Sequence, residues 1–218
     1  RLESELLMSH LLGWERHELY FKKDFILPSR QMESFKRMLE RRLAGEPVQY
    51  ITGVRYFMGL PFHVDSRVLI PRWETEQLTD YVLNKAKGKS KVFILDLCTG
   101  SGAIAVSLAV NLPDAEITAT DIETGALEVA RKNAEKLGVI QHISFYQGDL
   151  FASLKDAKFH GYFDIIVSNP PYIPTGEISA LMTEVRDYEP VTALDGGKDG
   201  LDFYRRISRD AWQYLKDD

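Results

Sequence analysis

The alternation of apolar runs and helical patterns from residue 92 onward is the feature that most constrains the fold. Residues 92–95 form a continuous apolar run, as expected for a strand buried on both faces, and residues 103–110 follow as a helix. Further strand patterns lie at residues 116–120, 143–146 and 163–167. Strands that alternate with helices form parallel sheets with right-handed crossovers. We therefore expect an α/β domain with a Rossmann-like sheet.

A glycine-rich segment, Asp-Leu-Cys-Thr-Gly-Ser-Gly at residues 96–102, lies where the first strand turns into a helix. Glycine lets a backbone approach a ligand closely, and ligands of open α/β sheets bind outside the carboxyl ends of the strands. Asp121 ends the second strand, where a carboxylate can accept hydrogen bonds from both hydroxyls of a ribose. The loop also fits a relaxed dinucleotide-binding pattern. On the loop alone, NAD, S-adenosylmethionine and a turn without a ligand remain alternatives.

The end of the third strand offers further candidate contacts. Asp149 can reach an adenine amino group, and Leu150 and Phe151 can pack against the ring. A helix cap or loop position is the alternative for Asp149. We interpret Cys98 as a small packing residue of the glycine loop, because no adjacent histidine is present to activate its thiol.

The tetrapeptide Asn169-Pro170-Pro171-Tyr172 follows the fourth strand and favours one of these cofactors. An amide nitrogen is a poor nucleophile because its lone pair is delocalised, so an enzyme needs acceptors aimed at its N–H bonds. The side-chain oxygen of Asn169 and the backbone carbonyl of Pro170 are such acceptors, and the consecutive prolines preorganise them. Tyr172 can stack on a flat amide or base. The pattern predicts methyl transfer from S-adenosylmethionine to a planar nitrogen, with a rigid turn as the alternative.

Composition argues against several other classes of function. The net charge of −5 argues against a strongly basic nucleic-acid-binding surface, and the histidines lack metal-ligand spacing, so no metal site is predicted. Cys98 is the only cysteine, which suits a reducing cytoplasm. No apolar stretch is long enough to span a membrane, and the N-terminus lacks the pattern of a secretory signal. We expect a cytoplasmic protein without a membrane partner.

Three parts are predicted along the chain. Residues 1–46 are expected to form a small helical domain, and residues 47–70, rich in β-formers, a β-hairpin linker. Residues 71–218 hold the α/β domain, which a helix opens. Two apolar stripes at helical spacing support the first part: Leu2, Leu6, Leu7 and Leu11, then Met32, Phe35, Leu39 and Leu43.

These motifs together resemble the HemK (PrmC) family, the glutamine methyltransferases of peptide chain release factors. The resemblance covers nearly the whole chain and rests on residues 42–51, 70–76, 96–102, 169–173 and 188–201. It implies a seven-stranded class I S-adenosylmethionine methyltransferase domain, a helical N-terminal domain that docks the protein substrate, and a Gly-Gly-Gln glutamine as the target. S-adenosyl-L-methionine would be the cofactor and S-adenosyl-L-homocysteine the product. The implied cofactor contacts are Cys98, Thr99, Gly100, Ser101, Gly102, Asp121, Leu150 and Asn169, with Pro170, Pro171 and Tyr172 completing the amide pocket.

The chain departs from the family pattern in two places. Trp73 stands where the family usually has a second proline. The chain ends at Asp218, where the family continues into its last strands. We expect the helical part to be incomplete and the sheet to lack those strands.

Other acceptors and other functions stay open. A ribosomal protein glutamine or a DNA adenine shares this chemistry, although the acidic balance disfavours DNA, whose phosphates attract clustered Lys and Arg. An NAD-dependent oxidoreductase or a non-catalytic binding module leaves the tetrapeptide unexplained.

Several polar residues have two interpretations. Arg72, Glu74 and Thr75 either border the cofactor site or, as we favour, begin a helix whose dipole suits acidic residues. Glu189 and Asp199 either order the loop over the site or are solvated. We assign Arg205, Arg206 and Arg209 to the polar side of a terminal helix.

Overall fold

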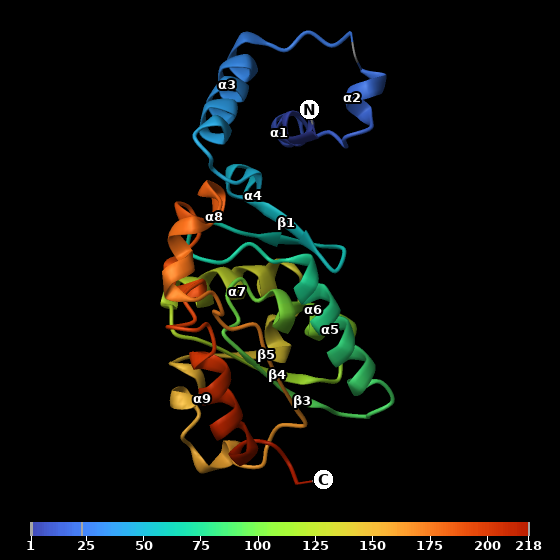
Figure 1. Ribbon diagram of the computed structural model, residues 1–218. Coiled ribbons are helices and arrows are strands. Elements are labelled where there is room, and N and C mark those ends of the chain that lie inside the picture. Colours follow the sequence, from blue (N-terminus) through green and yellow to red (C-terminus); the bar gives the residue numbers. More distant parts are fainter. Residues whose placement is uncertain (1, 23, 218) are drawn as a thin grey trace.

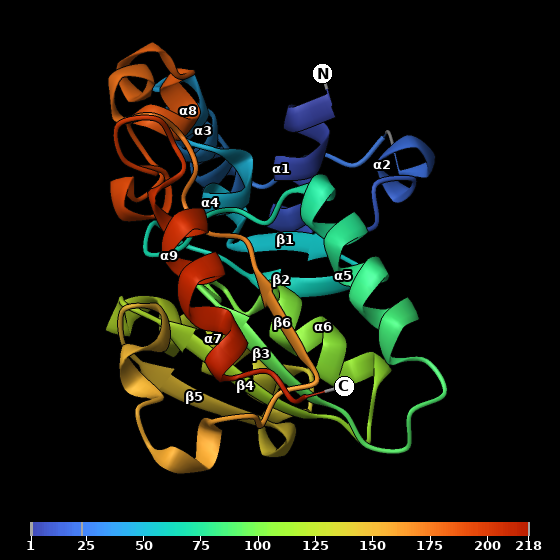
Figure 2. The ribbon, with the colours of Figure 1, turned by 60° about the horizontal axis from the view of Figure 1, so that its bottom comes forward.

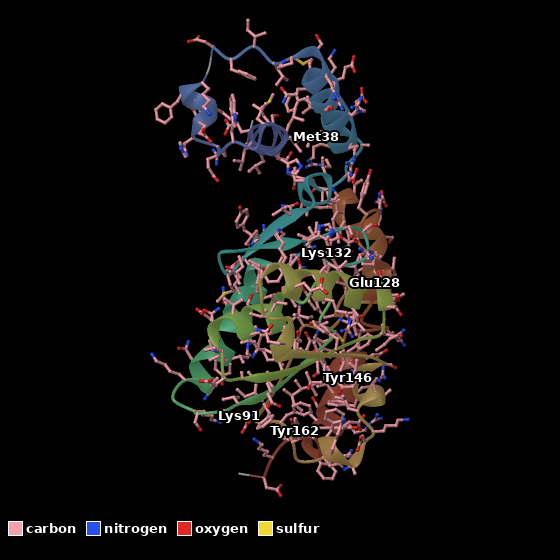
Figure 3. All side chains as sticks on the ribbon, turned by 180° about the vertical axis from the view of Figure 1, so that it is seen from behind. Met38, Lys91, Glu128, Lys132, Tyr146 and Tyr162 are labelled. Carbon is pink, nitrogen blue, oxygen red and sulfur yellow. The ribbon has the colours of Figure 1, made fainter. Side chains whose placement is uncertain are left out.

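The N-terminal part of the chain is helical, as predicted. The computed structural model describes residues 2–22 and 24–217 (Figure 1). Its first four helices are α1 (Leu2–Leu12), α2 (Glu18–Phe21), α3 (Ser29–Leu43) and α4 (Val48–Thr52). Leu7, Val48 and Ile51 form their buried core, and Met38 packs against it, lying between α3 and α1 in Figure 3. This small core holds α1, α3 and α4 together.

The predicted apolar stripes are only partly buried. Two residues of each predicted stripe are exposed: Leu2 (53%) and Leu6 (39%) in the first, and Met32 (40%) and Leu43 (86%) in the second. The short helix α4, which the stripes do not predict, supplies two of the three buried core residues instead.

The hairpin is shorter than predicted, because its first residues are helical. Strands β1 (Val54–Phe57) and β2 (Leu60–His63) pair antiparallel. The prediction that residues 47–70 form a β-hairpin linker is wrong for Val48–Thr52: Pro47 precedes α4, and Gly53, at φ +69°, ends it in the left-handed conformation that favours glycine. Tyr50 is thereby buried, and its hydroxyl donates to the carbonyl of Val68 (2.6 Å).

The main sheet has four parallel strands in the order β5-β4-β3-β6, which confirms the predicted α/β architecture. Their bounds are β3 (Phe93–Leu97), β4 (Glu116–Asp121), β5 (Ile143–Gln147) and β6 (Ile165–Ser168). The resemblance implies seven strands, and the described residues hold these four. Leu215 also makes a parallel bridge to Phe163, just before β6.

Helices cover both faces of this sheet (Figure 2). On one face lie α5 (Trp73–Ala86), α6 (Ala103–Asn111) and α7 (Thr124–Lys136), which share a large apolar core with the strands. On the other face lie α9 (Asp202–Asp210) and 3₁₀ turns at Leu150–Ser153, Ala157–Phe159 and Ala211–Gln213. In the part of the chain that the structure describes, no helix is long and apolar enough to cross a membrane.

The segment between β6 and α9 runs back to the N-terminal helices. It contains α8 (Thr183–Arg186) and 3₁₀ turns at Thr175–Ala180 and Val191–Ala193; another 3₁₀ turn, Ile140–His142, precedes β5. Tyr188 donates its hydroxyl to the carbonyl of Ala44 (2.9 Å), and Glu184 pairs with Arg42 at the end of α3. The segment between β6 and α9 therefore contacts the N-terminal helices and also reaches the carboxyl edge of the sheet.

Candidate active site

A pocket of about 450 Å³ lies at the carboxyl edge of the sheet. The loops after β3, β4, β5 and β6 form its walls, together with two side chains of α9, residues 190–193, and Arg67, Val68, Leu69, Pro71, Thr75 and Asp195. Gly102, Phe151, Pro170 and Tyr172 lie outside this lining, and the Phe151 ring stacks on Tyr214 in the core instead of facing the pocket. The structure brings these sequence-predicted residues together in the lining: Cys98, Thr99, Gly100, Ser101, Asp121, Asp149, Leu150, Asn169 and Pro171.

The glycine loop uses its backbone N–H groups within the protein. The N–H of Thr99 donates to the carbonyl of Thr120 (3.0 Å). The N–H of Gly100 donates to Oδ2 of Asp121 (2.8 Å), and that of Gly102 to the carbonyl of Thr99 (2.9 Å). A pyrophosphate at such a turn needs free N–H donors. Because these three N–H groups are used within the protein, the loop offers few donors to a pyrophosphate, which weighs against NAD.

Two glycines of the loop have different roles. Gly100 has φ +56°, and a Cβ built on it would meet nothing within 4 Å, so the backbone faces open space. Gly102 has φ +78°, and its added Cβ would lie 3.0 Å from Cβ of Ala130. Gly102 thus serves the close packing of α6 on α7, whereas Gly100 leaves room for a ligand.

Two other lining residues have a strained backbone. Cys98 (φ +59°) and Leu150 (φ +51°) are in the left-handed region, which costs a non-glycine residue roughly 1–3 kcal/mol. Burial raises the pKa of the Cys98 thiol to about 12, so the thiol stays protonated. This protonation agrees with a packing role for Cys98 and not with a nucleophilic one.

Asp121 is held by two backbone donors. Gly100 donates to its Oδ2 and Glu123 to its Oδ1, at 2.8 Å and 3.0 Å. Burial raises the pKa of this carboxyl group above its ordinary value. Because each carboxylate oxygen accepts more than one hydrogen bond, both retain capacity toward the pocket. The arrangement fits a pair of ribose hydroxyls.

Asp96 is a buried acid that sequence reasoning did not single out. Its Oδ2 accepts from the hydroxyl of Thr99 (2.6 Å) and the N–H of Ala105 (3.2 Å), whereas Oδ1 has no partner among the described residues. Burial raises the pKa of Asp96 to about 7. Asp121 and Asp149 make the pocket side of this edge acidic, whereas Asp96 lies outside the pocket lining. These acceptor groups fit S-adenosylmethionine, which carries two hydroxyls and a cationic sulfonium and ammonium group.

We expect Asp96 to make stability depend on pH. Its pKa in the folded protein lies above the ordinary 3.8, so the folded state binds the proton more tightly than the unfolded state. Its stabilising contribution is therefore present below pH 3.8 and is lost as pH rises through about 7. Thermal unfolding of the wild type and Asp96→Asn across this range checks the effect. The Tm of the variant should rise relative to the wild type with pH, and a constant difference would contradict this account.

Asp149 pairs with a residue from the other end of the domain. Its Oδ2 accepts from Nη2 of Arg206 on α9 (2.6 Å). Arg206 lines the pocket, so its assignment to the polar side of a terminal helix is wrong. That assignment fits Arg205 and Arg209, which are themselves exposed and pair with Asp199 and Asp210. Asp149 precedes a 3₁₀ turn without capping it through its side chain, so the cap alternative is not supported.

The tetrapeptide begins where β6 ends. The hydroxyl of Ser168 donates to the carbonyl of Leu97 (2.8 Å), which fixes the end of β6 against β3. Asn169 is half-buried in the pocket lining, and its Nδ2 donates to Oγ1 of Thr75 (3.4 Å). Both prolines are buried, and the Tyr172 ring is 53% exposed beside the pocket. The side-chain oxygen of Asn169 is thereby left available as an acceptor.

The start of α5 combines both interpretations of its residues. Trp73 begins the helix, Arg72 precedes it, and Thr75 lines the pocket. Nη2 of Arg72 donates to both carboxylate oxygens of Glu189 (2.7 and 2.8 Å). The Glu189 side chain is only 2% exposed, so its solvated interpretation is wrong. Asp199 is exposed and pairs with Arg205, which agrees with the solvated interpretation.

Two glycines after the tetrapeptide were missed as site residues, although the family-like run contains them. Gly196 donates its N–H to the carbonyl of Ile173 (2.8 Å), and its added Cβ would lie 2.6 Å from Cα of Tyr172. An added Cβ on Gly200 would overlap the carbonyl oxygen of Tyr172. Residues 196–200 therefore press directly on the backbone of the tetrapeptide.

We expect Gly200→Ala to displace this backbone. The position has φ +76° as well as the overlap with Tyr172, so the variant should lose about 1–3 kcal/mol of stability and much of its methyl transfer. Gly176→Ala is the matched control, because its added Cβ meets nothing within 4 Å. Thermal unfolding and transfer assays on both variants check this. Equal behaviour of the two variants would contradict the packing role of Gly200.

A second hollow, of about 630 Å³, lies away from these residues. Figure 3 shows Lys91, Tyr146 and Tyr162, three of its lining residues, at the end of the molecule far from the N-terminal helices. Lys91 pairs with Glu116 (2.5 Å), which also accepts from the hydroxyl of Tyr162 (3.2 Å). The hollow contains none of the sequence-predicted site residues. Within the described ranges, no group of three or more His, Cys, Asp or Glu is placed to hold a metal ion.

Comparison with known proteins extends the likeness to the whole chain. Residues 1–53 match the PrmC N-terminal domain, and residues 75–185 match the methyltransferase small domain. The release factor glutamine methyltransferase of Geobacter sulfurreducens is 45% identical over 99% of this chain and 73% of its own length. That of Bacillus subtilis is 42% identical over 98% of this chain and 74% of its own. The chain belongs to the release factor glutamine methyltransferase family.

Family membership confirms the resemblance inferred from the motifs. A solved structure of the hMettl16 catalytic domain, in complex with a MAT2A 3′UTR hairpin, supports the fold. It has a TM-score of 0.56 and 17% identity, and covers 83% of this chain and 73% of that chain. The class I methyltransferase fold is therefore common to this family and to a more distant enzyme.

Proposed function

We propose that this chain methylates the side-chain amide nitrogen of the glutamine in the Gly-Gly-Gln motif of peptide chain release factors, with S-adenosyl-L-methionine as cofactor. The relatives that cover nearly the whole chain carry that activity in their names. The observation that carries the proposal is the position of Asn169, in the lining of the same pocket as the glycine loop and Asp121.

The acidic edge would hold the cofactor. Asp121 would accept hydrogen bonds from the ribose hydroxyls. Oδ2 of Asp149 accepts a hydrogen bond from Arg206, and its other oxygen would accept one from the adenine amino group. Leu150 would pack on the ring. When bound, S-adenosylmethionine supplies a methyl group on a positively charged sulfur.

The tetrapeptide would hold the glutamine. Oδ1 of Asn169 and the carbonyl of Pro170 would each accept one N–H of the amide, which turns the nitrogen lone pair toward the methyl group. Positioning and preorganised dipoles are the main catalytic resource in such a site. The amide nitrogen would gain the N–CH₃ bond as the S–CH₃ bond breaks, with the neutral thioether S-adenosyl-L-homocysteine as leaving group, and would then lose one proton to water, so no strong general base is required. Tyr172 would stack on the amide plane.

An acceptor comparison tests this function against the alternatives. The protein would be incubated with labelled S-adenosylmethionine and, separately, with an unmodified release factor, a ribosomal protein fraction and adenine-containing DNA. We expect label in the release factor alone. Label confined to ribosomal protein or to DNA would overturn the proposed acceptor.

A further inference from the structure

We propose that Thr75 is a positioning residue that sets the orientation of the Asn169 side-chain amide. It would hold Nδ2 away from the substrate, so that Oδ1 faces the amide nitrogen to be methylated. This inference rests on the proposed function, because it assigns a partner to the residue that would bind the glutamine.

The orientation matters because an asparagine side chain is chemically asymmetric. Oδ1 is an acceptor only, and Nδ2 carries two donors, yet the two ends have nearly the same shape. A rotation of 180° about the last torsion would present N–H groups to the N–H groups of the substrate. Such a donor–donor contact would repel the glutamine nitrogen. The site therefore needs an acceptor that holds Nδ2 on the side away from the substrate.

Thr75 is placed to be that acceptor. Its Oγ1 lies 3.4 Å from Nδ2 of Asn169, and the residue is 9% exposed. Within the described ranges, the Asn169 side chain makes no other hydrogen bond to the protein. Thr75 and Asn169 both line the pocket. The contact joins two elements, α5 and the end of β6, that lie far apart in sequence.

The first turn of α5 is itself fixed in place. Thr79, one turn later, donates its hydroxyl to the carbonyl of Thr75 (2.9 Å). Glu76 accepts the N–H of Met58 from the hairpin turn (2.9 Å). Just before the helix, Arg72 pairs with the buried Glu189. Because these contacts fix the turn, the Thr75 hydroxyl presents a defined acceptor to Asn169.

The test compares four variants of the full chain. Thr75→Val keeps the shape of the side chain but removes the hydroxyl, and Thr75→Ala removes it without adding a methyl group. Thr75→Ser keeps the hydroxyl. Thr118→Val is the matched control, because it removes a buried threonine hydroxyl of β4 that lies outside the pocket lining. For each variant, kcat and KM for a release factor, Kd for S-adenosylmethionine, and Tm are measured.

We expect kcat to fall about 10-fold or more in Thr75→Val and Thr75→Ala, with Kd for the cofactor changed less than about twofold. Thr75→Ser and Thr118→Val should stay within about threefold of the wild-type kcat. Wild-type kcat in both hydroxyl-free variants, or an equal loss in Thr75→Ser, would overturn the positioning role. A wild type that transfers no methyl group to the release factor would overturn the proposed function and this role with it.

Discussion

Replacing Asn169 with alanine should lower methyl transfer to the glutamine by about 100- to 1000-fold. The estimate follows from the loss of one preorganised polar group that acts on the reacting nitrogen. The cofactor contacts of the glycine loop and Asp121 remain in this variant, so Kd for S-adenosylmethionine should change much less than kcat. Single-turnover transfer to a release factor, with calorimetric cofactor binding, measures both quantities.

Asn84→Ala is the control for this prediction. Asn84 is an exposed asparagine of α5 whose Nδ2 donates to the carbonyl of Asp80 within the helix. It should retain wild-type transfer, and both variants should keep the wild-type Tm within a few degrees. Near-normal turnover of Asn169→Ala would exclude an amide pocket in which Asn169 accepts a hydrogen bond from the glutamine.

Replacing Asp121 with alanine should weaken cofactor binding by about 10- to 100-fold. A hydrogen bond to a charged acceptor contributes about 1.5–3 kcal/mol, and Asp121 would accept bonds from a ribose. The same carboxylate also holds the N–H groups of Gly100 and Glu123, so the glycine loop should loosen as well. Calorimetric titration with S-adenosylhomocysteine measures the change.

Asp114→Ala provides the comparison for Asp121. Asp114 is exposed just before β4, at the opposite end of the strand from Asp121. Its removal changes the net charge equally but leaves the carboxyl edge intact. If both variants bound the cofactor as tightly as the wild type, Asp121 would have no place in the ribose site.

The sheet was predictable because its signals are local. A strand buried on both faces needs a continuous apolar run, which predicts Phe93–Leu97, whereas Ile143–Gln147 is buried on one face only. Both strands coincide with the predicted ones within two residues. The glycine loop and tetrapeptide were predictable for a related reason, since chain order alone places them at the carboxyl ends of β3 and β6. The strand prediction failed at residues 50–52 because Pro47 and Gly53, which delimit the short helix α4, override the β propensity of these residues.

The missed parts of the site depend on contacts between distant segments. Arg206 contacts Asp149, and Thr75 contacts Asn169. The residues of each pair are far apart in sequence, so no hydrophobic periodicity predicts that they meet. The buried Glu189 pairs with Arg72, which lies 117 residues earlier in the chain. The sequence did contain one usable signal: the two glycines at 196 and 200 lie in the run that resembles the family most specifically. Their close packing on Tyr172 explains why glycine stands there.

The most direct test of the central claim is peptide mass spectrometry of an unmodified release factor after incubation with this protein and S-adenosylmethionine. A release factor whose Gly-Gly-Gln glutamine is replaced by alanine is the control. We expect one added methyl group, located by fragmentation on the glutamine side chain of the Gly-Gly-Gln peptide and absent from the control. An unmodified Gly-Gly-Gln peptide, from a sample that binds the cofactor, would contradict glutamine methylation of release factors by this chain.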